Sequence, residues 1–123
     1  VGDTNGYEIL IAGTDPKLVK FQIDVFWMTW AKQDPLAYMK KLAGRVPMMH
    51  IKDRKKNWRW NQIEFPGDTE VPYTEVGTGA VDWKSIFAHA ADVKHIFVEQ
   101  DTWDRKPMES ARMSFEYLKG LTL

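Results

Sequence analysis

Three side chains that commonly bind metal ions or transfer protons stand at the ends of three short apolar runs. Asp24, His50 and Glu99 each follow directly on a short, mostly apolar run. Runs of this length and character are typical of buried parallel strands. Because the carboxyl ends of parallel strands meet at one rim of a sheet or barrel, we expect these side chains to lie close together. Two carboxylates and an imidazole suit a divalent cation, so the spacing predicts a metal site at that rim.

Strand-like and helix-like segments alternate along the chain, which predicts an α/β fold. The expected strands are 20–24, 46–50 and 96–99. The expected helices are 5–12, one starting at Asp15–Pro16, one from Asp34 to Gly44, one starting at Asp82 and one from Pro107 to Gly120. Asp and Pro favour the first turn of a helix, and Gly favours its end. This alternation implies parallel strands joined by right-handed crossovers.

Two further segments carry expectations about packing. Met108, Ala111, Phe115 and Leu118 recur at helical spacing on the last helix, so we expect this apolar stripe to face the core. The segment 52–73 is a long polar and aromatic stretch without a clear period. Loops of such length inside a compact unit are usually functional or mobile.

The number of expected strands sets a limit on the architecture. A closed parallel barrel needs eight strands and roughly 250 residues, whereas three strands would leave two unpaired edges and an uncovered face. Either the unit is an open, doubly wound sheet, or the chain is part of a larger fold.

Composition narrows the class of protein. The 123 residues suit one compact unit. The 17 basic residues balance 17 acidic ones, which argues against a protein built mainly to bind nucleic acid or an anionic membrane. The chain has no cysteine, which excludes disulfides and thiolate metal sites, and no apolar stretch approaches the ~18 residues of a membrane span. We therefore expect a cytoplasmic enzyme. The six tryptophans suit either a ligand cleft or ordinary packing.

Four motifs carry a resemblance to a known family. They are Phe21–Trp27, an apolar run ending in Asp with Trp three residues on; Gly44–Asp53, with His-x-Lys-Asp; Glu75–Trp83, with Gly-x-Gly; and Val98–Asp101, with Glu-x-Asp. Together, in this order and over about residues 5 to 121, they resemble the C-terminal half of the sugar phosphate isomerase/epimerase family, the xylose isomerase-like TIM barrels. The resemblance implies that residues 1–123 form a single unit, a fragment holding about strands 6–8 of a (β/α)8 barrel.

The resemblance also implies a set of metal ligands. In that family one divalent metal is held by Glu, Asp, His and Glu from successive strands, and Asp24, His50 and Glu99 match the last three. The first Glu would lie on the fifth strand, before Val1, and neither Asp3 nor Glu8 ends an apolar run. The implied activity is isomerase, epimerase or related lyase, with the isolated fragment expected to be inactive. Mn²⁺, Mg²⁺, Co²⁺ and Zn²⁺ all suit such ligands.

The implied chemistry is proton removal next to a carbonyl of a sugar or polyol, which gives an enediolate. Glu99 would be one of two glutamates that act as base and acid, and Lys52 would contact a substrate oxygen or its developing charge. Trp27 would lie against the apolar face of the sugar, with Trp103 and Asp101 as further substrate contacts.

Simpler interpretations exist for each residue. Taken singly, Asp24 suits a helix cap, His50 a hydrogen-bonded histidine and Glu99 a solvated strand end, and only their joint occurrence favours the site. Lys52 suits pairing with Asp53 or Asp101. Gly77 and Gly79 suit a tight turn better than a phosphate cradle, because no P-loop lysine follows.

Two other functions remain open, and the chain also carries an expectation about its oligomeric state. Segment 53–60 mixes basic residues with tryptophans, as in modules that bind single-stranded nucleic acid or carbohydrate. The neutral overall charge, however, argues against a nucleic-acid partner. The resembling family also includes keto-inositol dehydratases, which use the same enolisation. We also expect a homo-oligomer, because a half-barrel would expose a large apolar surface.

Overall fold

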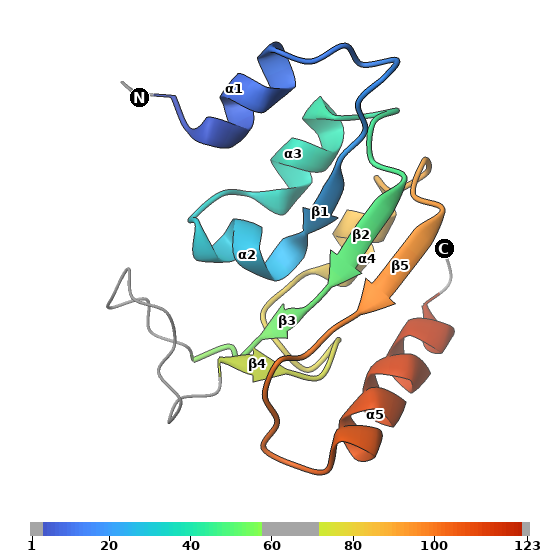
Figure 1. The fold of residues 1–123 in the computed structure, drawn as a ribbon. Helices are drawn as coiled ribbons and strands as arrows, with labels where there is room; N and C mark the ends of the chain where they lie inside the picture. The colour runs from blue at the N-terminus through green and yellow to red at the C-terminus, as the bar shows by residue number, and fades with distance from the viewer. Residues whose placement is uncertain (1–3, 58–71, 122–123) are drawn as a thin grey trace.

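The computed structural model describes residues 4–57 and 72–121 and contains a central parallel sheet of three strands (Figure 1). The strands are β1 (Gln22–Asp24), β2 (Met48–Ile51) and β5 (His95–Val98), in the spatial order β1-β2-β5. The ends of each strand differ from the predicted ends by at most two residues. The predicted α/β class with parallel strands is therefore confirmed.

Five helices accompany the sheet in the described part of the chain. They are α1 (Gly6–Ala12), α2 (Val25–Trp30), α3 (Pro35–Lys41), α4 (Trp83–Phe87) and α5 (Pro107–Gly120). Asn5, Asp34 and Asp82 cap their helices by accepting backbone N–H bonds, which confirms these predicted starts. Figure 1 shows α4 behind the sheet and α5 beside β5. No helix of residues 4–57 and 72–121 is long and apolar enough to cross a bilayer.

One face of the sheet forms the core. Ile23, Met49 and Ile51 are at most 1% exposed and point toward the helices. They pack in a cluster that also contains Leu42 and Trp83. Burying side chains of this size stabilises a fold by roughly 1.5–3 kcal/mol each, so this face holds the sheet against α3 and α4. Alternate residues of the same strands consequently point to the opposite face.

The strand register brings the predicted ligands into line. Asp24 on β1 lies opposite His50 on β2, and His50 lies opposite Phe97 on β5. The pairing continues past β5, because Glu99 N donates to the Ile51 carbonyl at 3.1 Å. The ends of all three strands therefore meet at one edge of the sheet.

Two predictions about helices were wrong. Asp15–Pro16 begins a single turn rather than a helix: the Asp15 carbonyl accepts from Leu18 N and Val19 N, and the chain then enters β1. No helix was predicted at 25–30, where α2 follows β1 without a loop. Its β-branched and aromatic residues resemble a strand, but Asp24 caps the first turn and sets a helix.

The packing expected of β5 and α5 was also wrong. Ile96, Phe97 and Val98 are 43–45% exposed, and β5 is an edge strand of the sheet. On α5, Met108 is 79% and Phe115 is 59% exposed, and of the predicted apolar stripe only Leu118 packs against the core.

The side of α5 that packs inward carries two serines in addition to Tyr117 and Leu118. Ser110 and Ser114 are buried; Ser110 Oγ donates to Glu75 Oε1 at 2.7 Å, and Ser114 Oγ accepts from Val76 N at 3.1 Å. Hydrogen bonds to the 75–76 segment thus decide which face of α5 turns inward.

The two ends of the expected long loop pair with each other as two short strands. β3 (Asp53–Arg54) pairs antiparallel with β4 (Tyr73–Thr74). The intervening residues 58–71 lie outside the described residues, and with them the tryptophans of the 53–60 segment. This pairing matters because it brings Tyr73 back to the end of β2.

Candidate metal centre

Asp24 lies at the end of β1, and both its backbone and its side chain are held by hydrogen bonds or strand pairing. It ends β1 and caps α2, so Oδ1 accepts from Trp27 N at 3.0 Å. Oδ2 faces His50 Nδ1 at 3.6 Å. Burial raises the pKa of the Asp24 carboxyl, opposed by the Trp27 hydrogen bond and the nearby Lys52 charge. The helix-cap interpretation and the site interpretation are therefore compatible, because each uses a different oxygen.

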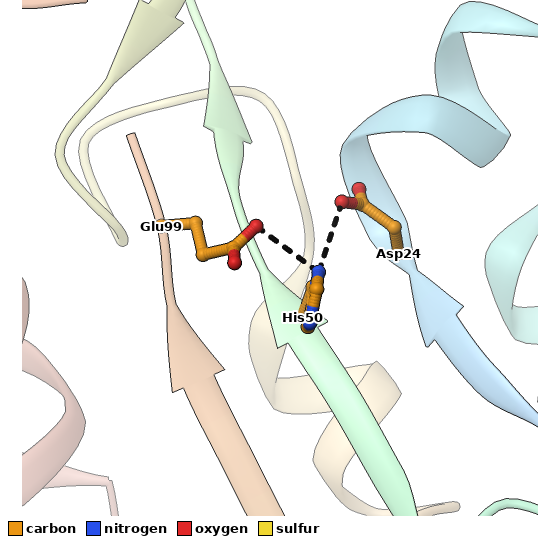
Figure 2. A group of neighbouring side chains, drawn as sticks. All are labelled: Asp24, His50 and Glu99. Carbon is orange, nitrogen blue, oxygen red and sulfur yellow. Dashed lines mark ion pairs between the residues drawn. The ribbon is translucent and has the colours of Figure 1, made fainter. Parts of the chain in front are cut away.

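His50 lies between the two carboxylates, as Figure 2 shows. Its Nδ1 is 3.0 Å from Glu99 Oε2, and its other nitrogen, Nε2, contacts the Gln22 side-chain amide. The Gln22 contact fixes the plane of the ring, so Nδ1 faces the carboxylates. One donor atom each from Asp24, His50 and Glu99 lies within 4.8 Å of the others. The structure thus brings together the three predicted ligands.

This donor set fits a divalent cation. Carboxylate oxygens are hard ligands and an imidazole nitrogen is a borderline one. Such a set suits Mg²⁺, Mn²⁺, Co²⁺ and Zn²⁺. The three groups are half-buried and come from three different strands, so the sheet holds their backbones apart by a fixed distance. Glu8, one of the acids considered for a fourth ligand, lies on α1 and pairs with Lys41 instead. Asp3 lies outside the described residues.

Lys52 adds a basic side chain to the group formed by Asp24, His50 and Glu99. It is 3% exposed, and its Nζ lies 3.3 Å from Glu99 Oε2 and 3.8 Å from Asp24 Oδ2. Both oxygens of Asp101 lie 3.2 Å from the same Nζ. Of the two partners considered from the sequence, Asp101 is therefore the one that Lys52 contacts.

Tyr73 lies beside these charged groups, although no sequence pattern pointed to it. It is 5% exposed, and its ring centroid lies 5.7 Å from Lys52 Nζ, with the Trp27 ring at the same distance. Burial, followed by a hydrogen bond with Asp101, raises the pKa of the Tyr73 hydroxyl well above its ordinary value. The ammonium thus lies near two aromatic rings and among three carboxylates.

The two predicted tryptophans lie on opposite sides of the cluster. Trp27 and Asp24 line a cavity of about 380 Å³ that extends toward α1. Trp103, 45% exposed, and Glu99 line another of about 260 Å³ between β5 and α5. Each cavity has an aromatic side chain beside one of the predicted metal-binding residues. The substrate contacts of Trp27, Trp103 and Asp101 stay predictions.

Gly77 and Gly79 form the predicted turn. Gly77 has φ +90°, which favours glycine. The N–H groups of both glycines donate to Asp53 Oδ2, at 3.1 and 3.2 Å. The turn is therefore organised around a protein carboxylate, as the tight-turn interpretation expects.

Similar proteins give this arrangement a context. The chain matches inosose dehydratases from Clostridium beijerinckii (26% identity over 132 residues) and Clostridium perfringens (29% over 132 residues), with 99% of this chain aligned in both. Among solved structures, a sugar phosphate isomerase/epimerase from Parabacteroides distasonis superposes on 92% of the chain with a TM-score of 0.68 and 27% identity. The chain resembles the sugar phosphate isomerase/epimerase family. The resemblance predicted from the four motifs is thereby confirmed.

The match covers only part of each relative. The chain spans 44% of the two dehydratases and 35% of the Parabacteroides distasonis protein. No family model matches the chain. The similarity therefore supports a sugar-processing enzyme family and a TIM-barrel-like α/β fold for the aligned portion.

Proposed function

We propose that this chain carries the metal-binding rim of a sugar-converting enzyme that removes a proton next to a carbonyl. The observation that carries the proposal is the convergence of Asp24, His50 and Glu99 at the carboxyl ends of three adjacent parallel strands. Active sites of parallel α/β barrels are built at this end of their strands. The substrate class is a sugar, sugar phosphate or related polyol.

We further propose that β1, β2 and β5 correspond to the sixth, seventh and eighth strands of the family barrel. Their order, their parallel direction and the motif at the end of each support this assignment. Residues 1–123 then form one structural unit whose two sheet edges face the remainder of such a barrel or another copy of the chain.

Asp24, His50 and Glu99 would hold a divalent metal, which would act as a Lewis acid toward a substrate carbonyl and an adjacent hydroxyl. The Glu99 carboxylate, at the end of β5, accepts the proton from the neighbouring carbon, and the electron pair of the broken C–H bond forms the double bond of an enediolate. Lys52 stands 3.3 Å from Glu99 and offers a positive charge to the oxygen that becomes negative. Return of a proton to the other carbon gives isomerisation, and return on the other face gives epimerisation.

Dehydration is a second candidate, favoured by the names of the matched inosose dehydratases. It begins with the same proton transfer to Glu99. The enediolate then expels a hydroxyl group from the next carbon, and this hydroxyl takes up the proton held by Glu99 and leaves as water. The same residues serve both reactions, so substrate rather than site distinguishes them.

A titration with Mn²⁺ followed by electron paramagnetic resonance tests the proposal. We expect one Mn²⁺ per chain, with binding lost in Asp24→Asn and Glu99→Gln. The matched control is Asp104→Asn, which removes a carboxylate that pairs with Lys55 outside the cluster. Equal Mn²⁺ affinity in the wild type, both site variants and the control would contradict the proposal.

A homo-oligomer is proposed for the chain in solution. β1 and β5 each have one edge without a strand partner among the described residues, and Ile96, Phe97 and Val98 on β5 are exposed. Pairing between copies would cover both. Light scattering tests this, and a monomer at micromolar concentration with a cooperative thermal transition would contradict it.

A further inference from the structure

The Lys52 ammonium and the proposed metal compete for the same two oxygen atoms. Glu99 Oε2 lies 3.3 Å and Asp24 Oδ2 lies 3.8 Å from Lys52 Nζ. The same oxygens face His50 Nδ1, at 3.0 and 3.6 Å. A divalent cation held by those three groups would stand next to a full positive charge. Repulsion at such short range in a partly buried site is strong, so the ammonium needs another partner when the metal is present.

Asp101 is the partner that the structure offers. Both of its carboxylate oxygens lie 3.2 Å from Lys52 Nζ, which is as close as any other contact of the ammonium. Its side chain is 49% exposed, and it is not one of the three groups whose donor atoms converge. Asp101 therefore contacts the lysine without occupying a ligand position.

Tyr73 restrains this pair from the other side. It reaches the cluster from β4, and the Asp101 carboxylate contributes to the raised pKa of its hydroxyl. The centroid of its ring lies 5.7 Å from Lys52 Nζ, so the aromatic face is within reach of a cation–π contact with the ammonium. The lysine is 3% exposed, so it has no ready access to bulk water as an alternative partner.

We propose that Asp101 and Tyr73 are positioning residues that retain the Lys52 ammonium beside the substrate while a divalent cation occupies Asp24 and Glu99. The inference rests on the proposed function. Without the cation, Lys52 shares the three carboxylates. With it, Lys52 gives up Asp24 and Glu99, keeps Asp101 and stays next to the reacting oxygen. Tyr73 holds Asp101 in place through its hydroxyl group.

A double-mutant cycle on Mn²⁺ affinity tests the proposal without any measurement of activity. The variants are Lys52→Met, Asp101→Asn and the two combined. We expect Lys52→Met to bind Mn²⁺ at least about threefold more tightly, because the competing charge is gone. Asp101→Asn should bind at least about threefold more weakly while Lys52 is present, because the ammonium then falls back on the ligands, and should have no effect in the Lys52→Met background.

Two further variants make the test sharper. Tyr73→Phe keeps the ring and loses the hydroxyl, and should weaken Mn²⁺ binding in the same direction as Asp101→Asn, with no effect in the Lys52→Met background. The control pair is Lys55→Met with Asp104→Asn, which removes an exposed ion pair of the same type. It should leave the affinity unchanged. Lys52→Gln replaces Lys52→Met if the latter fails to fold.

The outcomes separate the two proposals. Equal weakening by Asp101→Asn in both backgrounds would make Asp101 a ligand and overturn the inference, while the metal site stands. Unchanged affinity in Lys52→Met would overturn it as well. Absence of Mn²⁺ binding in both the wild type and Lys52→Met would remove the proposed function, and the inference with it. Unchanged affinity in Tyr73→Phe would remove Tyr73 from the positioning role.

Discussion

Two neighbouring residues at the end of β2 place their charges in opposite environments. Lys52 points into the strand-end cluster, defined as Asp24, His50, Lys52, Glu99 and Asp101. Asp53 points away from it and is fully buried. The Asp53 carboxylate accepts hydrogen bonds from the backbone N–H groups of Arg54, Gly77, Gly79 and Val81 and from the Trp83 indole, at 2.8–3.2 Å.

The comparison separates a structural carboxylate from functional ones. Five donors satisfy the Asp53 carboxylate completely, so it fixes the 77–81 turn and has no capacity for a ligand. In the strand-end cluster, three carboxylates share one ammonium among the described residues, and they are partly exposed. An excess of converging negative charge attracts a cation, whereas a saturated carboxylate does not.

The largest expected effect is on stability, at Asp53. Asp53→Ala should lower the free energy of unfolding by about 3–5 kcal/mol, because it leaves several buried N–H groups without acceptors. Urea denaturation measures this. The control is Trp83→Phe, which removes only one of the five donors to Asp53 and should therefore lose far less hydrogen-bond energy than Asp53→Ala. A loss below about 1 kcal/mol for Asp53→Ala would show that the turn does not depend on it.

The second effect tests how tightly the turn surrounds that carboxylate. A Cβ at Gly79 would overlap Asp53 Oδ1 and the Arg54 carbonyl, so Gly79→Ala should destabilise the fold by about 1–3 kcal/mol. Gly120→Ala meets no atom within 4 Å and serves as the control. Equal thermal midpoints for the two variants would contradict the described packing.

The strand-end cluster should behave in the opposite way. Asp24→Asn keeps a side chain that can cap α2 and removes one of the crowded negative charges, so stability should change by less than about 1 kcal/mol. Mn²⁺ binding should nevertheless be lost. Thermal denaturation with and without Mn²⁺ measures both, since a ligand that binds the folded state raises its stability. Destabilisation as large as that of Asp53→Ala would remove the distinction between the two regions.

The smallest effect concerns acid sensitivity at Glu75. Burial raises the pKa of this carboxyl, but the Ser110 hydrogen bond and the Arg105 charge outweigh it and leave the pKa below its ordinary value. The charged form therefore stabilises the fold above the unfolded-state pKa of 4.5, and this contribution is lost as pH falls through the lower folded-state pKa.

Glu75→Gln should consequently lose less stability than the wild type between neutral pH and pH 3, by about 1 kcal/mol or less. The control is Glu116→Gln, the same change at an exposed position of α5. Urea denaturation at several pH values measures the difference. An acid dependence identical in the wild type and Glu75→Gln would contradict the role of the Ser110 and Arg105 contacts.

Much of the strand-end cluster was predictable from sequence, because it depends on local patterns. Apolar runs define strands, parallel strands align their ends, and Asp24, His50 and Glu99 each stand at such an end. Lys52 follows from the same register, two residues after His50. These relations need no knowledge of distant contacts.

The remainder depends on contacts that no local pattern encodes. Tyr73 meets Lys52 only because β3 and β4 pair across residues 58–71. The orientation of α5 depends on two hydrogen bonds to a segment more than thirty residues earlier: Ser110 donates to Glu75, and Ser114 accepts from Val76. The helix after β1 was missed because one cap at Asp24 overrides the strand-like residues that follow.

A crystal structure with Mn²⁺, with the ion located by its anomalous scattering, tests the central claim most directly. The account predicts one ion bonded to Asp24 Oδ2, His50 Nδ1 and Glu99 Oε2 at about 2.0–2.3 Å, the range of such bonds. An ion bound away from these three atoms, or no ion at saturating Mn²⁺, would contradict it.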